Sequence, residues 1–245
     1  MPDLLLPGAE PDFAAVAKPP GIETVSAAGA PDAVSLARNR LGWESALPVH
    51  RLDRDTSGAL LVARTPEAEK ELTRLFRERL VVKRYLAISL GAPFNRSGVI
   101  NRNLSDWDGG RRPVRVVKGN GGLEASTDYR VVAVGPDSGF FGREAGLIVF
   151  SPHQGRTHQI RVHAAALGHP LLGDDRYGDR VANKAARDRL GIRRQALHSW
   201  RLAFPWKGGR KEVVCDPPPD LARAMELLFG EGIRGLLEKI KQTAV

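Results

Sequence analysis

The stretch HRLDRDTSG, residues 50–58, brings carboxylates, arginines and hydroxyls together within one short segment. A carboxylate that acts as a nucleophile or a base must stay ionised while it is partly desolvated, and a neighbouring guanidinium favours that charged form. Asp53 is then the candidate reactive group. Thr56 and Ser57 can hydrogen-bond the loop backbone, and Gly58 permits a tight turn. A solvated surface turn with exposed ion pairs has the same composition, so the stretch alone favours neither interpretation.

Metal chemistry is the second possibility, because four histidines lie within residues 153–169. His158 and His163 are five residues apart, whereas two ligands on one helical face need a spacing of three or four. No nearby cysteine or glutamate completes a tetrahedral set. We therefore predict hydrogen-bonded structural histidines and no metal. The alternative is a metal-dependent hydrolase built on these histidines, which full activity in excess chelator would exclude.

Three common catalytic patterns do not occur in the sequence: the G-x-x-x-x-G-K-[ST] phosphate loop, the G-x-S-x-G elbow and the H-E-x-x-H zinc motif. Their absence argues against a nucleotide-driven enzyme, an α/β hydrolase and a zinc protease. The only cysteine, Cys215, excludes an intrachain disulfide and a cysteine-rich zinc site.

The elements that must position Asp53 begin directly after it. The apolar run over 58–64 predicts a buried strand. A helix then begins with Thr65 as its N-cap and Pro66 in its first turn. Its predicted apolar face consists of Ala68, Leu72, Leu75, Phe76 and Leu80.

The rest of the chain predicts many short elements with few helices between them. Helices are expected over 33–41, over 157–168 with Gly168 as the C-terminal cap, and twice after Pro219. Strands are expected over 13–18, 83–90, 125–134 and 145–152, followed by a hairpin over 196–206 and 211–215. This order favours an α+β fold with a mixed, mostly antiparallel sheet, flanking helices and loops. We expect a single domain over 1–245.

Charge points to the class of partner. The 245 residues include 37 Lys plus Arg and 28 Asp plus Glu, a net charge of +9 and a pI near 10.1. Such an excess favours a polyanion, because each neutralised phosphate releases counterions; a surface that only maintains solubility is the alternative. No apolar run reaches the length of a membrane span, and no signal peptide is apparent, so we expect a cytoplasmic protein.

Five ordered segments resemble the motifs of the RluA-like pseudouridine synthases. The segment HRLDRDTSG resembles the central motif of this family, and KPPG (18–21) its N-terminal motif. KRYLA (83–87) is similar to the tyrosine motif, and GRTHQIRVHAAALGHPLLGDDRYG (155–178) to the arginine motif. ALHSWRLAFP (196–205) resembles the late leucine-histidine strand. The resemblance covers about residues 13–206, and a chance match of five ordered motifs is negligible.

The resemblance implies isomerisation of uridine in RNA to pseudouridine, with no cofactor and no metal. It gives Asp53 the catalytic role, either by attack on C1′ or by removal of the 2′ proton. Arg161 is expected to pair with Asp53 and keep it ionised. Tyr85 is expected to stack on the flipped uracil and to help remove the C5 proton, although the residues alone favour a buried strand aromatic. Arg51 is expected to fill the vacated base stack.

The segment 101–122 is rich in glycine and basic residues and carries one tryptophan. Four of its cations are predicted to contact RNA phosphates: Arg111, Arg112, Arg115 and Lys118. A solvated hairpin tip is the alternative. After KPPGI the sequence reads ETVSAAG, which departs from the family's usual valine-histidine-proline continuation.

The length of the chain before the first motif bears on how the substrate is recognised. The chain has no room before residue 13 for the small RNA-binding domain of many relatives, so we expect the catalytic domain itself to recognise structured rRNA or tRNA. We expect a monomer without a membrane partner. A non-catalytic RNA-binding protein on the same scaffold is the remaining alternative, and an Asp53→Asn variant separates the two.

Overall fold

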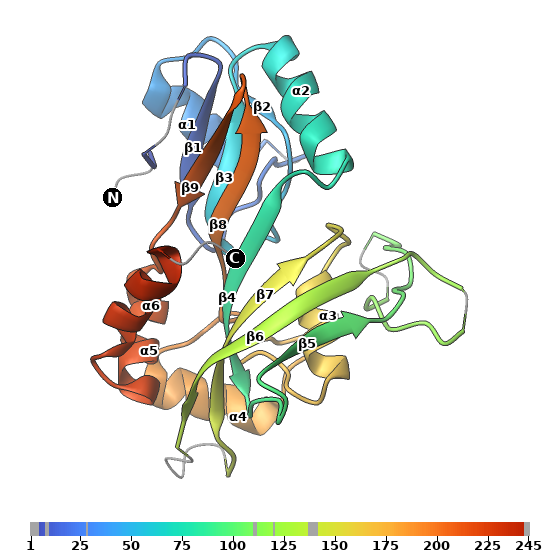
Figure 1. Ribbon diagram of the computed structural model, residues 1–245, viewed down its shortest axis with the longest axis vertical. Coiled ribbons are helices and arrows are strands. Elements are labelled where there is room, and N and C mark those ends of the chain that lie inside the picture. The colour runs from blue at the N-terminus through green and yellow to red at the C-terminus, as the bar shows by residue number, and fades with distance from the viewer. Residues whose placement is uncertain are drawn as a thin grey trace. The chain divides into compact units, whose positions relative to one another are not determined.

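The computed structural model describes residues 5–7, 10–27, 29–109, 112–119, 121–136 and 142–242. In these residues it contains nine strands, six α-helices and one π-helical turn (Figure 1). Most of the strand pairs are antiparallel, and β3 and β8 are parallel. The predicted α+β class with a mixed, mostly antiparallel sheet is therefore confirmed. None of the described helices combines the length and hydropathy that a bilayer crossing requires.

The chain divides into two compact units. The first consists of Met1–Tyr85, Ser151–Thr157 and Leu197–Pro217, and the second of Leu86–Phe150, His158–Ala196 and Pro218–Val245. Two strands contribute residues to both units: β4 (Val82–Leu90) and β7 (Ala145–Pro152).

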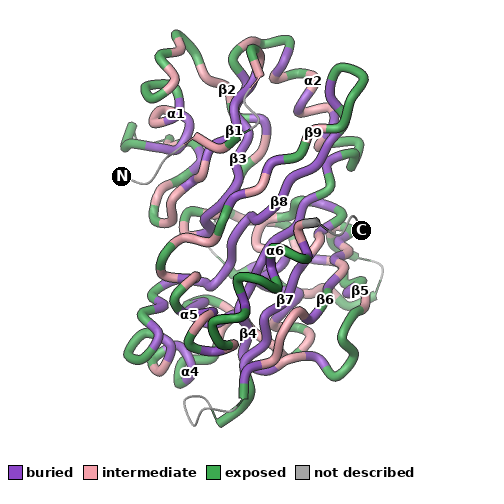
Figure 2. The backbone as a smooth tube through the Cα atoms, turned by 60° about the vertical axis from the view of Figure 1, so that its left-hand side comes forward, coloured by how far each residue is buried: buried purple, intermediate pink, exposed green. Residues whose placement is uncertain are grey.

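In the first unit the hydrogen-bonded strand order is β1-β3-β8, with β2 beside β3 and β9 beside β8. Its strands are β1 (Phe13–Lys18), β2 (Leu47–Pro48), β3 (Ser57–Ala63), β8 (Leu197–Trp206) and β9 (Gly209–Val214). Every residue of β3 is buried, as the tube colouring of Figure 2 shows along β3 and most of β8. Because β3 is covered on both faces, its sequence is apolar without alternation.

The helices of the first unit are α1 (Ala33–Leu41) and α2 (Pro66–Arg77). The predicted cap of α2 is confirmed, since the backbone N–H of Ala68 donates to the Thr65 hydroxyl at 3.2 Å. Ala68, Leu72 and Leu75 are buried in the core, with Phe204 among their neighbours. Leu80 was expected on this face, but it lies after the end of the helix and is 45% exposed.

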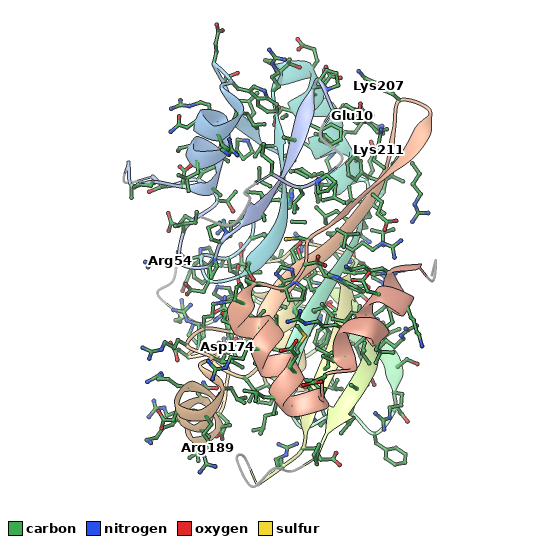
Figure 3. All side chains as sticks on the ribbon, turned by 90° about the vertical axis from the view of Figure 1, so that its left-hand side faces the viewer. Glu10, Arg54, Asp174, Arg189, Lys207 and Lys211 are labelled. Carbon is green, nitrogen blue, oxygen red and sulfur yellow. The ribbon has the colours of Figure 1, made fainter. Side chains whose placement is uncertain are left out.

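Ion pairs join the β8–β9 hairpin to the segment before β1. Lys207 pairs with Asp12, and Lys211 pairs with Glu10 (Figure 3). These charges lie at the end of β8 that is remote from His198, the residue in register with Ser57.

In the second unit the strand order is β4-β7-β6-β5, with β5 (Ser97–Asn101) antiparallel to β6 (Ser126–Gly135). The helices are α3 (Gln159–Ala166), α4 (Arg180–Ala185), α5 (Pro219–Phe229) and α6 (Ile233–Gln242), and a π-helical turn follows α4 over Ala186–Leu190. The predicted end of α3 is confirmed: Gly168 has φ +86°, and the next residue donates its N–H to Ala164 O at 3.0 Å.

Buried polar side chains fix α3 against β6. Gln159 Nε2 donates to Ser126 O at 2.9 Å and to Thr127 Oγ1 at 3.0 Å. His163, fully buried, has Nδ1 2.9 Å from Thr127 Oγ1 and Nε2 2.9 Å from Arg102 O. Because a buried polar group must be paired, these bonds set the rotation of α3 and hence the direction of Arg161.

Candidate active site

Asp53 lies on the loop that leads into β3 and is partly buried. The backbone N–H of Thr56 donates to Asp53 O at 3.0 Å, which closes the turn. Ser57 Oγ is 3.0 Å from His198 Nδ1 on the neighbouring strand. Gly58 has φ +120°, and a Cβ there would lie 2.2 Å from Ser199 O. Thr56 and Ser57 are 2% exposed, so the chain immediately after Asp53 is held in the core.

The KPPG segment is bonded to the Asp53 loop through a buried ammonium group. Lys18 Nζ donates to the carbonyls of Pro19, Ile22 and Arg54 at 2.9, 2.7 and 2.8 Å, and the side chain is 1% exposed. Gly21 N also donates to Arg54 O, and Arg54 Nε to Gly21 O, each at 3.0 Å (Arg54 is labelled in Figure 3). Two of the sequence motifs therefore form one hydrogen-bonded structure.

The unusual ETVSAAG continuation contacts the same loop. The hydroxyl of Thr24 donates to Leu52 O at 3.1 Å and accepts from Leu52 N at 3.0 Å. Thr24 is 6% exposed and Leu52 is 5% exposed. The residue next to Asp53 thus has both its backbone groups satisfied by one side chain, which fixes the chain on the other side of the carboxylate.

Tyr85 lies on β4 and is brought close to Asp53 within the first unit. Burial raises the pKa of Tyr85 to about 12; a hydrogen bond with Ser199 opposes that rise, and the negative charge of Asp53 adds to it. The phenol is therefore neutral at physiological pH. The role of Tyr85 as the aromatic partner of Asp53 stays a prediction.

Two further titratable groups near this region were not predicted. Burial and the charge of Arg79 lower the pKa of Lys83 to about 8, and Lys83 Nζ donates to Gln154 O at 2.7 Å. Burial and the charge of Lys83 lower the pKa of His50 to about 3. His50 Nε2 accepts the Leu61 N–H at 2.9 Å. His50 is therefore a neutral acceptor that anchors the motif on β3.

Arg161 lies on α3 in the second unit and binds Asp174. Arg161 Nε and Nη2 donate to the two Asp174 oxygens at 2.7 and 2.8 Å, and Asp174 is fully buried. Figure 3 labels Asp174. Burial alone would raise the pKa of Asp174, but the hydrogen bonds and charge of Arg161 hold it below the usual value. The pairing of Arg161 with Asp53 stays a prediction. Asp174 was missed, although it stands in the GDDRYG end of the arginine motif.

Asp174 also organises the loop that follows it. Its Oδ1 accepts the backbone N–H groups of Arg176 and Tyr177, each at 3.0 Å. Its carbonyl accepts from Gly178 N at 2.8 Å and from Asn183 Nδ2 at 2.9 Å. The Arg161 guanidinium carbon lies 5.1 Å from the centre of the Tyr177 ring. One buried carboxylate therefore fixes both the arginine and the tyrosine beside it.

The predicted RNA-contacting cations have different surroundings. Arg112 is exposed and hydrogen-bonded to Asp108, with Nε 3.2 Å from Oδ2, a partner that the sequence reasoning did not consider. Arg115 and Lys118 are exposed in the same segment, and Arg51 is exposed beside Asp53. Arg111 lies outside the described residues. The role of these residues in RNA contact stays a prediction.

Two histidines of the arginine motif, His158 and His163, have hydrogen-bonding partners, whereas Nδ1 of His169 is buried without one among the residues that the structure describes. His158 Nδ1 is 2.9 Å from Tyr177 Oη, and both ring nitrogens of His163 are bonded as described above. In the part of the chain that the structure describes, no group of three or more metal-binding side chains comes together.

Comparison with known proteins identifies the family. The family model for RNA pseudouridylate synthase matches residues 12–166. The chain belongs to this family. An uncharacterized RNA pseudouridine synthase of Mycobacterium tuberculosis is 40% identical over 186 residues, 75% of this chain and 56% of that protein. The dual-specificity RNA pseudouridine synthase RluA of Escherichia coli is 40% identical over 152 residues, 62% of this chain and 66% of that protein. The RluA-like resemblance is thus confirmed.

Length and fold add to the comparison. The chain spans about half the length of several curated relatives; it covers 54% of ribosomal large subunit pseudouridine synthase D of Zymomonas mobilis, at 36% identity over 74% of this chain. The solved structure of human RNA pseudouridylate synthase domain containing 1 is similar over 98% of this chain and 94% of that chain, with 28% identity and a TM-score of 0.74.

Proposed function

We propose that this protein isomerises specific uridines in rRNA or tRNA to pseudouridine, with Asp53 as the catalytic carboxylate. The observation that carries the proposal is the match of residues 12–166 to the pseudouridine synthase family, in a chain whose partly exposed Asp53 contributes to the raised pKa of buried Tyr85. The loop on either side of Asp53 is hydrogen-bonded to Thr24 and Lys18, so the backbone that carries the carboxylate is fixed before substrate binds.

The chemistry needs only the substrate and side chains. The N1–C1′ bond breaks, the uracil turns, and C5 bonds to C1′; N1 gains a proton and C5 loses one, so no electrons are transferred. Asp53 acts as a carboxylate, by attack on C1′ or by removal of the 2′ proton. The proposal includes no metal or cofactor, and it takes the protein to be a cytoplasmic monomer.

Access to C1′ requires the target base to leave its stack. Arg51 is exposed on the loop, two residues before Asp53. In the proposal its side chain fills the space in the stack that the flipped base leaves. Tyr85 is assigned a stacking role, because a phenol with a pKa raised to about 12 supplies little phenolate at neutral pH. Arg161 is assigned to stabilise Asp53 as a carboxylate; the same guanidinium also binds Asp174 through Nε and Nη2.

Pseudouridine mapping of total RNA tests this proposal. Cells lacking the gene are complemented with the wild-type chain, Asp53→Asn, or Asp55→Asn as the neighbouring-carboxylate control. We expect one or more pseudouridines to disappear in the deletion strain, to return with wild type and Asp55→Asn, and to stay absent with Asp53→Asn. Pseudouridines that return fully with Asp53→Asn would refute the assignment of Asp53. An unchanged pseudouridine map in the deletion strain would refute the function.

A further inference from the structure

Three aromatic rings from distant parts of the sequence meet in the second unit. The rings of Trp107 and His158 have centroids 5.1 Å apart and meet edge to face at 72°. The rings of His158 and Tyr177 have centroids 5.5 Å apart and meet at 71°. We call these three residues the aromatic triad. All three side chains are only partly buried, so the triad reaches the surface.

The triad is supported from below by the core and by the Asp174 loop. Trp107 and Tyr177 pack against buried Leu104, Val114 and Val162. The Tyr177 backbone N–H donates to Asp174, and its hydroxyl is bonded to His158 Nδ1. These contacts fix ring orientation before any ligand arrives, which lowers the entropy lost on binding.

The backbone at His158 is in an unfavourable conformation. His158 has φ +58° although it is not glycine, and it directly precedes α3. This left-handed geometry is sparsely populated by residues with a Cβ, and such residues concentrate at ligand sites. Here the conformation is accompanied by the placement of the imidazole ring between Trp107 and Tyr177.

Two arginines lie over rings of the triad, and Asp106 and Asp108 flank Trp107 in the chain. The guanidinium carbon of exposed Arg176 lies 5.6 Å from the centre of the Trp107 ring, and Arg161 lies over Tyr177. Exposed Arg115 follows in the same segment as Trp107. Aromatic faces flanked by arginines are the chemistry that holds unpaired nucleobases next to their phosphates. An acidic protein partner would meet the cations but would leave the ring faces unused.

We propose that the aromatic triad is a second RNA subsite, at which an unpaired base of the substrate stacks on Trp107. The bound base replaces Arg176 over the indole, and Arg176 turns to the adjoining phosphate. An exposed arginine can make this change quickly, because its rotamers interconvert in nanoseconds or less. The inference rests on the proposed function for its ligand, single-stranded RNA, but it concerns binding and not the chemical step.

RNA affinity measured with the full chain tests the subsite. The probe is a stem-loop RNA with an unpaired, uridine-containing loop, titrated at several salt concentrations. We expect Trp107→Leu, which keeps an apolar side chain, to raise Kd by about 5- to 100-fold, in the range of one lost base stack. The slope of log Kd against log salt should not change. Trp107→Phe should recover most of the affinity.

Trp43 supplies a matched control. It is also partly buried and has an arginine, Arg64, over its ring at 5.9 Å, but it belongs to the first unit, whereas the triad belongs to the second. Trp43→Leu should leave Kd unchanged. Arg176→Ala should reduce the salt slope by about 0.7, the value for one phosphate on a single strand.

Two results would overturn the inference. One is an unchanged Kd for Trp107→Leu; the other is a loss that Trp107→Phe does not recover while both variants keep the wild-type melting temperature. Failure of the proposed function is a separate result. If the wild-type chain binds the RNA in a Trp107-dependent way but forms no pseudouridine, the subsite stands and the catalytic proposal falls.

Discussion

Two aspartates of this protein lie in opposite surroundings. Asp53 is partly exposed on a loop whose neighbours are held by hydrogen bonds from Lys18 and Thr24 to the backbone. Asp174 is fully buried, and both its oxygens bind Arg161. The first arrangement fixes the main chain on both sides of a partly exposed side chain. In the second arrangement the carboxylate stabilises the fold. A perturbed or buried carboxylate is therefore not the better candidate for chemistry here.

The largest expected effect comes from breaking the buried pair. Asp174→Asn should destabilise the protein by about 3–5 kcal/mol, because it leaves the buried Arg161 charge uncompensated. Asp175→Asn, at the exposed neighbouring position, should change stability by no more than about 0.5 kcal/mol. Denaturant unfolding measures both. Equal stabilities for the two variants would show that Asp174 does not hold the second unit together.

The corresponding change in the first region removes the ammonium of Lys18. Lys18→Met should cost about 2–3 kcal/mol, because three partly buried carbonyls lose a charged donor. It should lower kcat more than it raises KM, since the loop that carries Asp53 loses its fixed position. Lys70→Met, which changes an exposed lysine on α2, is the control. A normal kcat for Lys18→Met would show that the hydrogen bonds of the KPPG segment do not position Asp53.

A pH dependence tests whether the first region depends on a neutral histidine. His50 has a pKa near 3 when folded and an ordinary value near 6.5 when unfolded, so the unfolded chain takes up the proton first as pH falls. This group alone should remove about 2 kcal/mol of stability between pH 7 and pH 5. His50→Gln keeps an acceptor but cannot protonate, so its stability should fall less over this range. Parallel pH curves for the two proteins would contradict the assignment.

The smallest effect is expected at Thr24. Thr24→Val keeps the shape of the side chain but leaves buried Leu52 N without its acceptor. The free energy of unfolding should fall by about 1–2 kcal/mol. Thr24→Ser retains the hydroxyl and should be close to wild type. Thermal unfolding and kcat are measured together. If valine and serine behave alike, the hydroxyl does not fix the residue before Asp53.

Local patterns predicted most of the elements. The Thr65 cap, the Gly168 helix end and the strand over Ser57–Ala63 depend on neighbouring residues, and each was found within a residue of its expected place. The apolar face predicted for α2 wrongly included Leu80, which lies after the helix, because the spacing of apolar residues does not show where a helix ends. The short β2 and the exposed residues of β5 gave no clear alternating signal.

The site was predictable in its residue types but not in its bonding. Ordered motifs indicated Asp53, Tyr85 and Arg161, whereas the Arg161–Asp174 pair and the Lys18–Arg54 bond join residues whose partners no local pattern specifies. The same is true of Arg54, which received no role from its position in the motif and yet exchanges two hydrogen bonds with Gly21. Long-range hydrogen bonds to backbone carbonyls carry no signature in side-chain type.

The most direct test of the account is the activity of purified Asp53→Asn on the RNA that the deletion strain identifies. The substitution preserves the size of the side chain and removes its charge, so fold and RNA affinity should match wild type while pseudouridine formation falls by at least about 10⁴-fold. Mass spectrometry of the product nucleosides measures this. Turnover within about tenfold of wild type, with unchanged RNA binding, would contradict the central claim that Asp53 is the catalytic carboxylate.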